Sequence, residues 1–293
     1  MTASDVSIRI MTEDDLGLAL DWAAGEGWNP GLDDAASFHA ADPGGFLVAE
    51  RAGEAVGCVS AVRYGAGFGF LGFYIVRPDF RGRGYGLALW RAAMDRLAGR
   101  AVGLDGVLAQ QDNYRKSGFR LAYRNVRYEG VGGGQAPDGL VDLASGRSHE
   151  RPSLDGPSVS FDALSAYDRT VFPAERADFL RRWIRPPRGA ALGVVDEGAL
   201  RGYGVLRACR RGFKIGPLFA DDPAVAERLF QGLAARADGA PLVLDTPEVN
   251  PDAVALAQRH GMKPVFETAR MVAGEPPPTR LERCFGVTTF ELG

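Results

Sequence analysis

The chain has 293 residues, enough for two ordinary domains, and its formal charge of −3 leaves no overall basic surface, so nucleic acid and anionic membranes are not expected partners. Three cysteines and three histidines are scattered without metal-ligand spacing, which predicts buried thiols, no disulfide framework and no metal site. Without a leader or 18 uninterrupted apolar residues, a cytoplasmic location is expected.

The first elements are predicted to be a short strand at 7–11, a helix capped by Thr12 and a polar loop at 25–31. The loop, Gly-Glu-Gly-Trp-Asn-Pro-Gly, gathers a carboxylate, an aromatic ring and an amide just before a second helix at 35–40. Such a loop is either functional or a packed surface loop in which Trp28 only fills space. The residues themselves leave both interpretations open.

A hairpin, a central strand and a glycine-rich loop follow. Residues 45–50 and 55–62 predict the hairpin, and the aromatic-rich run 70–76 predicts a strand that ends before Pro78. Between this strand and the next helix lies Arg81-Gly82-Arg83-Gly84-Tyr85-Gly86. Glycines here allow backbone N–H groups to converge on an anion at the positive end of the helix dipole, which predicts a phosphate-binding loop. No Lys-Ser/Thr pair follows, which excludes a P-loop, and the glycine spacing does not fit the dinucleotide-binding motif.

Two motifs together resemble the Gcn5-related N-acetyltransferase (GNAT) superfamily: Arg81-x-x-Gly84-x-Gly86 after an apolar strand, and Tyr114-x-x-x-Gly118-Phe119. Members of this family bind acetyl-coenzyme A at such a loop, as a cosubstrate and without a metal. The resemblance implies that pyrophosphate is bound by the backbone of Arg81, Gly82, Arg83, Gly84, Tyr85 and Gly86. It also implies that the backbone of Tyr74, Ile75 and Val76 pairs with the pantetheine arm, which lies between the central strand and a splayed strand at 101–107.

The catalytic residues are predicted from the same resemblance. Tyr114 matches the tyrosine that is proposed to protonate the departing thiolate. Some members place a glutamate early in the central strand, but this chain has Phe70 there, so the base must come from elsewhere or act through water. The connection between the first two helices lines the acceptor side in this family, so Glu26 is the first candidate base and Asp105 the second.

The acceptor-side residues are expected to be Glu26, Trp28 and Asn29. Each candidate base also has a structural interpretation, because Glu26 could cap the following helix and Asp105 could hold a turn at Gly106.

The domain organisation is predicted as a catalytic domain at 1–133, a linker at 134–158 and a second GNAT-like domain at 159–293. Residues 120–128 are expected to close the sheet of the first domain, and 140–143 could add a strand inside the linker. The second domain repeats the layout of the first in strands at 191–195, 203–207, 213–219 and 242–245.

The second copy is predicted to lack the cofactor site. Asp221 and Asp222 stand where the first copy has its glycine-arginine loop, and carboxylates repel pyrophosphate. Ala257 stands at the place of Tyr114. Residues 284–292 are expected to add a final strand or to pack across the interface between the domains.

A cluster of charged and aromatic residues opens the second domain. Asp168, Arg169 and Arg176 could form an Arg-carboxylate site for an amino-acid-like acceptor, and a plain surface helix is the simpler interpretation.

The sequence therefore predicts an α/β (α+β) protein of two tandem GNAT-like domains, each with a mixed, mostly antiparallel sheet flanked by helices. The leading hypothesis is an acetyl-coenzyme A dependent N-acetyltransferase in which a primary amine of a small metabolite or amino-acid-like acceptor attacks the thioester directly. The alternatives are a protein N-acetyltransferase and a non-catalytic acyl-coenzyme A binding or sensing protein. The sequence does not distinguish a monomer from a homodimer.

Overall fold

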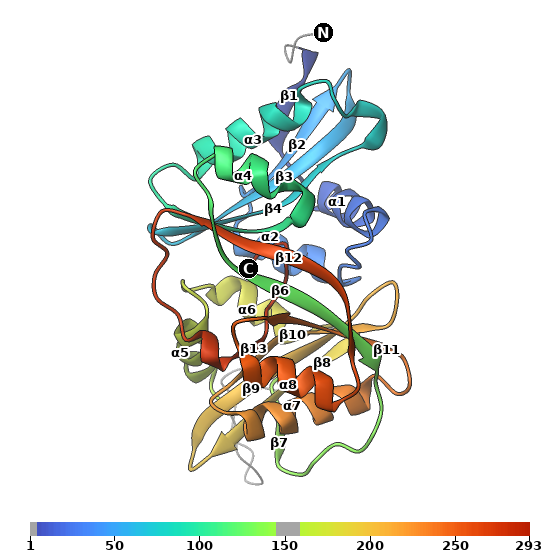
Figure 1. Ribbon diagram of the computed structural model, residues 1–293, viewed down its shortest axis with the longest axis vertical. Coiled ribbons are helices and arrows are strands. Elements are labelled where there is room, and N and C mark those ends of the chain that lie inside the picture. Colours follow the sequence, from blue (N-terminus) through green and yellow to red (C-terminus); the bar gives the residue numbers. More distant parts are fainter. Residues whose placement is uncertain (1–4, 145–158) are drawn as a thin grey trace.

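The computed structural model describes residues 5–144 and 159–293, which form an α/β fold around one continuous, mostly antiparallel sheet (Figure 1). The strand order is β1-β2-β3-β4-β5-β12-β6-β11-β10-β9-β8-β7, and β13 pairs with β10. Helices cover both faces of the sheet, so the predicted fold class is confirmed. Within the described ranges, no helix has both the length and the apolar character needed to cross a bilayer.

The first half of the chain follows the predicted order of elements. Its elements are β1 (Ser7–Ile10), α1 (Glu13–Gly25), α2 (Asp34–Ala41), β2 (Phe46–Arg51), β3 (Glu54–Tyr64), β4 (Phe68–Val76), α3 (Tyr85–Arg96), β5 (Ala101–Val107), α4 (Gln111–Lys116) and β6 (Arg120–Val131), with 3-10 turns at Pro78–Phe80 and Leu108–Gln110. The predicted cap of α1 is present, because the Thr12 hydroxyl accepts from the backbone N–H of Asp15 and the Asp15 carboxylate accepts from that of Thr12.

The second half repeats this order, as predicted. Its elements are β7 (Leu140–Asp142), α5 (Phe161–Val171), α6 (Ala177–Trp183), β8 (Gly189–Asp196), β9 (Ala199–Ala208), β10 (Phe213–Ala220), α7 (Pro223–Arg236), β11 (Pro241–Pro247), α8 (Pro251–Arg259), β12 (Lys263–Ala273) and β13 (Cys284–Gly286), with a 3-10 turn at Leu281–Arg283. The strand suggested within the predicted linker exists as β7, and residues 145–158 of that linker lie outside the described residues. The domain boundaries remain predictions.

The two halves exchange strands at the centre of the sheet. The expectation that residues 120–128 close the first sheet is wrong, because β5 pairs with β12 from the second half. In turn β6 lies between β12 and β11. Strands β6 and β12 are long and pair antiparallel with each other. Because each also pairs antiparallel with a strand of the other half, the exchange joins the two sheets into one without leaving a strand unpaired.

A C-terminal segment, residues 284–293, runs between the halves (Figure 1). Strands β10 and β11 pair only as far as Ile215 and Leu244, and β13 enters the wedge that opens beyond them. The backbone N–H of Val287 then donates to the carbonyl of Asp245 at 2.8 Å. The sequence predicted either a final strand or packing across the interface, and the segment does both.

Two equivalent glycines hold the C-terminal segment. In the first half Gly57 of β3 pairs with Val76 of β4, and in the second half Gly202 of β9 pairs with Ala220 of β10. Gly72 and Gly216 are equivalent because each lies four residues before the paired residue of its strand. A Cβ on Gly72 would lie 2.1 Å from the carbonyl oxygen of Glu291, and one on Gly216 would lie 2.4 Å from that of Thr288. Because real Cβ contacts are much longer, only glycine lets the segment pack directly on both strands.

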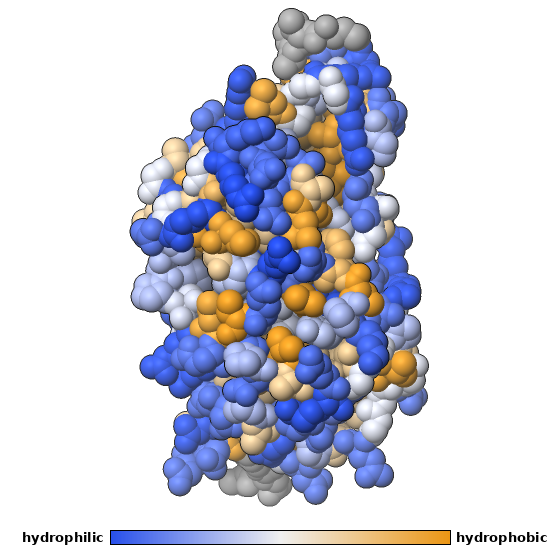
Figure 2. Space-filling model, viewed as in Figure 1, coloured by the Kyte–Doolittle hydropathy of each residue, from blue (hydrophilic) through white to orange (hydrophobic). Residues whose placement is uncertain are grey.

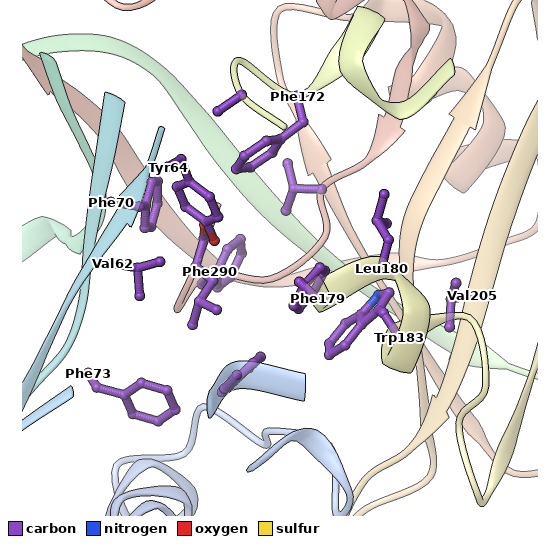
Figure 3. Close-up of a cluster of buried hydrophobic side chains, with 14 of the residues drawn as sticks. Val62, Tyr64, Phe70, Phe73, Phe172, Phe179, Leu180, Trp183, Val205 and Phe290 are labelled. Atoms are coloured by element: carbon purple, nitrogen blue, oxygen red, sulfur yellow. The ribbon is translucent and has the colours of Figure 1, made fainter. Parts of the chain in front are cut away.

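The main aromatic core lies between the halves (Figure 3). Phe38 from α2 stacks on Trp183 from α6 with ring centroids 5.9 Å apart, and Tyr64 from β3 meets the edge of Phe172 at 4.9 Å. Figure 2 shows apolar residues gathered across the middle of one face, whereas the two ends are mostly hydrophilic. The halves therefore share a core rather than a wet interface.

Asp168 and Arg176 belong to this interior, which corrects both interpretations for these two residues, whereas Arg169 is exposed as a surface helix predicts. Their side chains are 1% and 0% exposed, and the Arg176 guanidinium donates to the Asp168 carboxylate at 2.9 and 2.7 Å. The Tyr203 hydroxyl also donates to Asp168. The pair therefore ties α5 to the start of α6 and faces no acceptor. The three cysteines are free and buried, as predicted.

We expect Gly72→Ala to destabilise the protein by about 1–3 kcal/mol, because the added methyl group overlaps the Glu291 carbonyl and must displace the C-terminal segment. Gly67→Ala is the matched control, since a Cβ there meets nothing within 4 Å, and it should change stability by less than about 0.5 kcal/mol. Urea unfolding measures both. Equal stability of the two variants would show that the segment is not held at Gly72.

Candidate active site

A cavity of about 440 Å³ opens where β4 and β5 separate. The two strands pair in parallel from Phe68 and Ala101 to Leu71 and Leu104, and beyond that point the edge of β4 faces the cavity. The lining comes from β4, β5, β12, α4, the loop after α1 and the C-terminal segment. Volumes of this size are typical of sites for small ligands.

The open edge of β4 is shaped by a β-bulge. Between its pairings with Ser60 and Cys58, β4 has two residues, Phe73 and Tyr74, where β3 has one. Phe73 has a φ of +46°, which is uncommon for a residue with a side chain and indicates local strain. A bulge leaves its extra residue out of the ladder and re-aims neighbouring groups, so backbone groups of β4 face the cavity here.

The glycine-arginine loop joins this edge to α3. Gly82 and Gly84 have φ values of +74° and +86°, the left-handed region that favours glycine. Gly84 is the N-cap of α3 and offers no side chain to the first N–H groups of the helix. Those groups are therefore available to an anion, and the helix dipole favours one there.

The side chains of the loop mostly point away from that anion position. Tyr85 is buried and its hydroxyl donates to Asp5, whereas Arg83 donates to the carbonyl of Asp79. Gly86 lies against the Tyr74 hydroxyl, which a Cβ on Gly86 would approach to 2.9 Å. The arrangement leaves the backbone of the loop, rather than its side chains, as the surface for a ligand.

Arg81 is the exception, since its side chain spans the cavity mouth. Its Nε donates to the carbonyl oxygen of Val76 at 2.8 Å, and its Nη2 donates to Glu26 at 2.5 Å. Arg77 pairs with β3 through its backbone N–H, so the backbone of the preceding residue, Val76, faces the open edge. Arg81 therefore occupies one hydrogen-bonding position of that edge.

The equivalent position in the second half is closed. The Asp222 carboxylate accepts from the backbone N–H groups of Ala224 and Val225 and so caps α7. The wedge between β10 and β11 holds β13 instead of an open edge. Ala257 matches Tyr114 in its backbone, because its carbonyl accepts from Met262 as that of Tyr114 accepts from Phe119. The second copy thus lacks both the free helix end and the hydroxyl.

Tyr114 lines the cavity from α4 and is held by its neighbours. Its ring stacks on Trp90 at 5.5 Å, and a Cβ on Gly106 would lie 2.3 Å from the ring. Burial, with a smaller contribution from nearby Tyr74, raises the pKa of Tyr114 to about 12. Within the described residues its hydroxyl makes no hydrogen bond, so a protonated donor faces the cavity without a partner.

Three carboxylates line the cavity, and their partners differ. Glu26 is paired with Arg81 at the mouth. Asp105 is paired through both oxygens with Arg270, at 2.8 Å each, and also accepts from Asn125. Glu291 is 3% exposed, and its Oε1 has no hydrogen-bond partner within the described residues.

Glu291 was not singled out from the sequence. The available signal was a single carboxylate in the apolar C-terminal run Phe-Glu-Leu-Gly, which alone does not distinguish a buried acid from one at a frayed end. Its position in the cavity depends on the long-range packing of the C-terminal segment.

The loop at 25–31 brings two of its three predicted residues to the cavity. Glu26 and Trp28 line it, whereas Asn29 does not. The Asn29 amide donates to the carbonyl of Arg211 at 3.0 Å and accepts from its N–H at 3.2 Å. Asn29 thus docks the loop on the turn between β9 and β10.

Comparison with known proteins finds acyltransferases over nearly the whole chain. The model "Acetyltransferase (GNAT) family" matches residues 14–119, and the model "Acetyltransferase (GNAT) domain" matches residues 164–286. The chain is 29% identical over 276 residues to holothin acyltransferase of Pseudoalteromonas sp. (strain SANK 73390), a match that covers 93% of this chain and 90% of the relative.

Solved structures share the fold. A Pyrococcus horikoshii protein described as a candidate acetyltransferase superposes with a TM-score of 0.80 at 23% identity, over 99% of this chain and 96% of the other. A tandem GNAT protein from the clavulanic acid biosynthesis pathway superposes with a TM-score of 0.61 at 17% identity, over 94% and 100%. At these identities the likeness is one of fold.

We expect Gly106→Ala to destabilise the protein by about 1–3 kcal/mol, because its methyl group overlaps the ring of Tyr114, which is packed against Trp90 and must shift. In a Tyr114→Ala background the ring is gone and only the Leu104 side chain, 3.1 Å from the added Cβ, has to shift, so the same substitution should cost clearly less. Urea unfolding of the four proteins gives this double-mutant cycle. An equal cost in both backgrounds would mean that Gly106 does not position Tyr114.

Proposed function

We propose that this chain, which belongs to the GNAT superfamily and has two domains of that family in tandem, transfers an acetyl group from acetyl-coenzyme A to a primary amine of a small metabolite or amino-acid-like acceptor. Acyl transfer is the chemistry of the family, and the acetyl donor and amine acceptor are the proposal. One observation supports it most: the open edge of β4 and the Tyr114 hydroxyl, which has no hydrogen-bond partner among the described residues, line one cavity, and the chain runs from the mouth of that cavity at Arg81 to a helix start without a side-chain cap.

The cofactor-binding role is proposed for the first half alone. The backbone N–H groups of the Arg81 to Gly86 loop would hold the pyrophosphate, and the backbone of Tyr74, Ile75 and Val76 would pair with the amides of the pantetheine arm. Bound there, acetyl-coenzyme A supplies the thioester that the amine attacks. Arg81 would have to leave the Val76 carbonyl to admit the pantetheine, and its guanidinium would then be free for a phosphate.

Tyr114 is proposed as the general acid. With its pKa raised to about 12, it is protonated throughout the neutral range and can donate to a departing thiolate, whose ordinary pKa is about 8.5. Glu26 and Asp105 are the bases proposed from the sequence. Each would have to act from within an ion pair, and the double pairing of Asp105 with Arg270 makes Glu26 the more available of the two.

A small acceptor fits the cavity better than a protein segment. About 440 Å³ must accommodate the acetylated end of the cofactor and the acceptor together, and aromatic rings of Trp28, Phe266 and Phe290 surround that space. The Pseudoalteromonas relative is named as an acyltransferase of holothin. A protein N-acetyltransferase is therefore the less favoured alternative.

The alternative that is not an enzyme is a non-catalytic acyl-coenzyme A sensor. It is favoured by Phe70, which stands where some GNAT enzymes have a glutamate. The deciding experiment is a screen of acetyl-coenzyme A with amines, amino acids and lysine peptides, in which calorimetry reports binding and thiol release reports transfer. Transfer to a small amine supports the enzyme, transfer to peptides supports the second alternative, and binding without transfer supports the sensor.

We expect Gly84→Asp to abolish measurable acetyl-coenzyme A binding, because it places a carboxylate at the free helix end. Gly84→Asn is the matched control, since asparagine has nearly the same shape and the same tolerance of a positive φ but no charge, and it should retain most of the affinity. Ala224→Asp introduces a carboxylate in the first turn of α7 and should have no effect on this binding. Calorimetry checks all three, and a normal affinity of Gly84→Asp would exclude this loop as the pyrophosphate site.

We expect Tyr114→Phe to lower kcat about 10²- to 10⁴-fold with little change in acetyl-coenzyme A affinity, the effect of losing one general acid. In the wild-type protein the acid form is present below its pKa of about 12, so kcat should show no alkaline decline up to pH 10. Thiol release followed from pH 6 to pH 10 measures both. A decline centred near pH 8 to 9 would assign the acid role to another group.

A further inference from the structure

Glu291 is a buried carboxylate with an unused oxygen. It is 3% exposed, lies in the lining of the cavity and has no partner at Oε1 within the described residues. A buried acceptor without a hydrogen bond has lost its contacts with water and gained none from the protein, so the carboxylate of Glu291 is stabilised when a donor reaches it. The missing partner is a donor, and the cavity is where a donor could come from.

The Glu291 backbone is fixed directly on the bulged edge of β4. Its carbonyl packs on Gly72, the residue before the bulge, and accepts from the Ser60 hydroxyl at 3.4 Å. The Thr289 hydroxyl accepts from the N–H groups of Glu291 and Leu292 at 3.1 and 2.9 Å. The side chain therefore starts from a rigid position next to the strand edge where the thioester is proposed to lie.

Three buried cations interact electrostatically with Glu291: Arg127 on β6, Arg207 on β9 and Lys214 on β10. Arg127 is paired with Asp245 at 2.6 and 2.8 Å, and Arg207 is paired with Asp34. Lys214 lies 3.9 Å from the same Asp245.

Each of the three cations thus has a carboxylate other than Glu291 within ion-pair distance. No cation lies within ion-pair distance of Glu291 among the described residues, so its carboxylate is not consumed by the cluster.

The other two carboxylates in the cavity differ from Glu291 in this respect. Glu26 already neutralises Arg81, and Asp105 already neutralises Arg270 through both oxygens. An incoming ammonium group would have to compete with a guanidinium at either position. At Glu291 it would meet a carboxylate that lacks a donor.

We propose that the carboxylate of Glu291 binds the ammonium group of the acceptor and takes its proton, which makes Glu291 the general base of the proposed acetyl transfer and rests on that function. The ammonium nitrogen loses one proton to Glu291, which later releases it to water. The free amine forms the C–N bond as the C–S bond breaks. Tyr114 protonates the departing sulfur, and the nitrogen then gives up a second proton that restores the Tyr114 hydroxyl, so charges and atoms balance.

The rate arm of the test compares Glu291→Gln with the wild-type protein, using the best amine from the screen. The variant keeps the shape and loses the base, so kcat/KM at pH 7 should fall about 10²- to 10⁴-fold. The loss should shrink as pH rises, because the variant can use only amine that arrives deprotonated. Glu267→Gln is the matched control, since Glu267 lies on β12 outside the cavity lining, and it should behave as wild type.

The binding arm needs no turnover. With coenzyme A present at pH 7, the wild-type protein should bind benzylamine at least tenfold more tightly than benzyl alcohol, and Glu291→Gln should bind the two about equally. Calorimetry of acetyl-coenzyme A, unchanged in the variant, shows that the cofactor site and the fold are intact.

The two levels of the proposal fail differently. If the wild-type protein does not bind acetyl-coenzyme A, or transfers the acetyl group to no small amine, the proposed function is contradicted. A Glu291→Gln protein that keeps the wild-type rate at pH 7, or keeps the preference for benzylamine, overturns the role of Glu291 alone.

Discussion

The packing of one backbone segment against two glycines is the constraint on which the rest of the structure depends. Gly72 and Gly216 are equivalent positions in the two repeats, and at each of them a carbonyl group of the C-terminal segment packs in the space that a Cβ would need. One segment therefore fixes both halves at once. It fills the wedge of the second half with β13 and brings Glu291 to the wedge of the first.

The two halves share one fold, but the cavity between β4 and β5 in the first half has no counterpart between β10 and β11 in the second. In the first half, α3 begins at Gly84 without a side-chain cap and β4 has a free edge. In the second, Asp222 supplies an internal anion to α7, and β13 supplies an internal strand to β10. In the second half, protein groups thus occupy both the helix start and the strand edge, whereas the first half leaves both of them open.

Local elements were predictable from the sequence because their signals are local. Caps, turns and apolar periodicity placed most helices and strands, and the glycine loop with Tyr114 located the cavity. The exchange of β6 and β12 was not predictable, since an antiparallel strand fits either neighbour by its own pattern. Glu291 and the docking role of Asn29 were missed for a related reason: both depend on contacts between residues far apart in sequence.

The second half contributes to the cavity of the first although its own helix start and strand wedge are filled by protein groups. It holds the loop at 25–31 at three residues: Asn29 hydrogen-bonds to the backbone of Arg211, Gly31 forms a bridge with Cys209, and the carbonyl of Trp28 accepts from Lys214. Arg127, on β6 of the first half, also donates to the Trp28 carbonyl. These contacts fix Trp28 on one wall of the cavity, and the C-terminal segment fixes Phe290 and Glu291 on another. The first half thus supplies the strand edge and the loop, whereas the second determines the shape and charge of the opposite side. Changes in the second half should therefore alter which acceptor is used before they alter whether the cofactor binds.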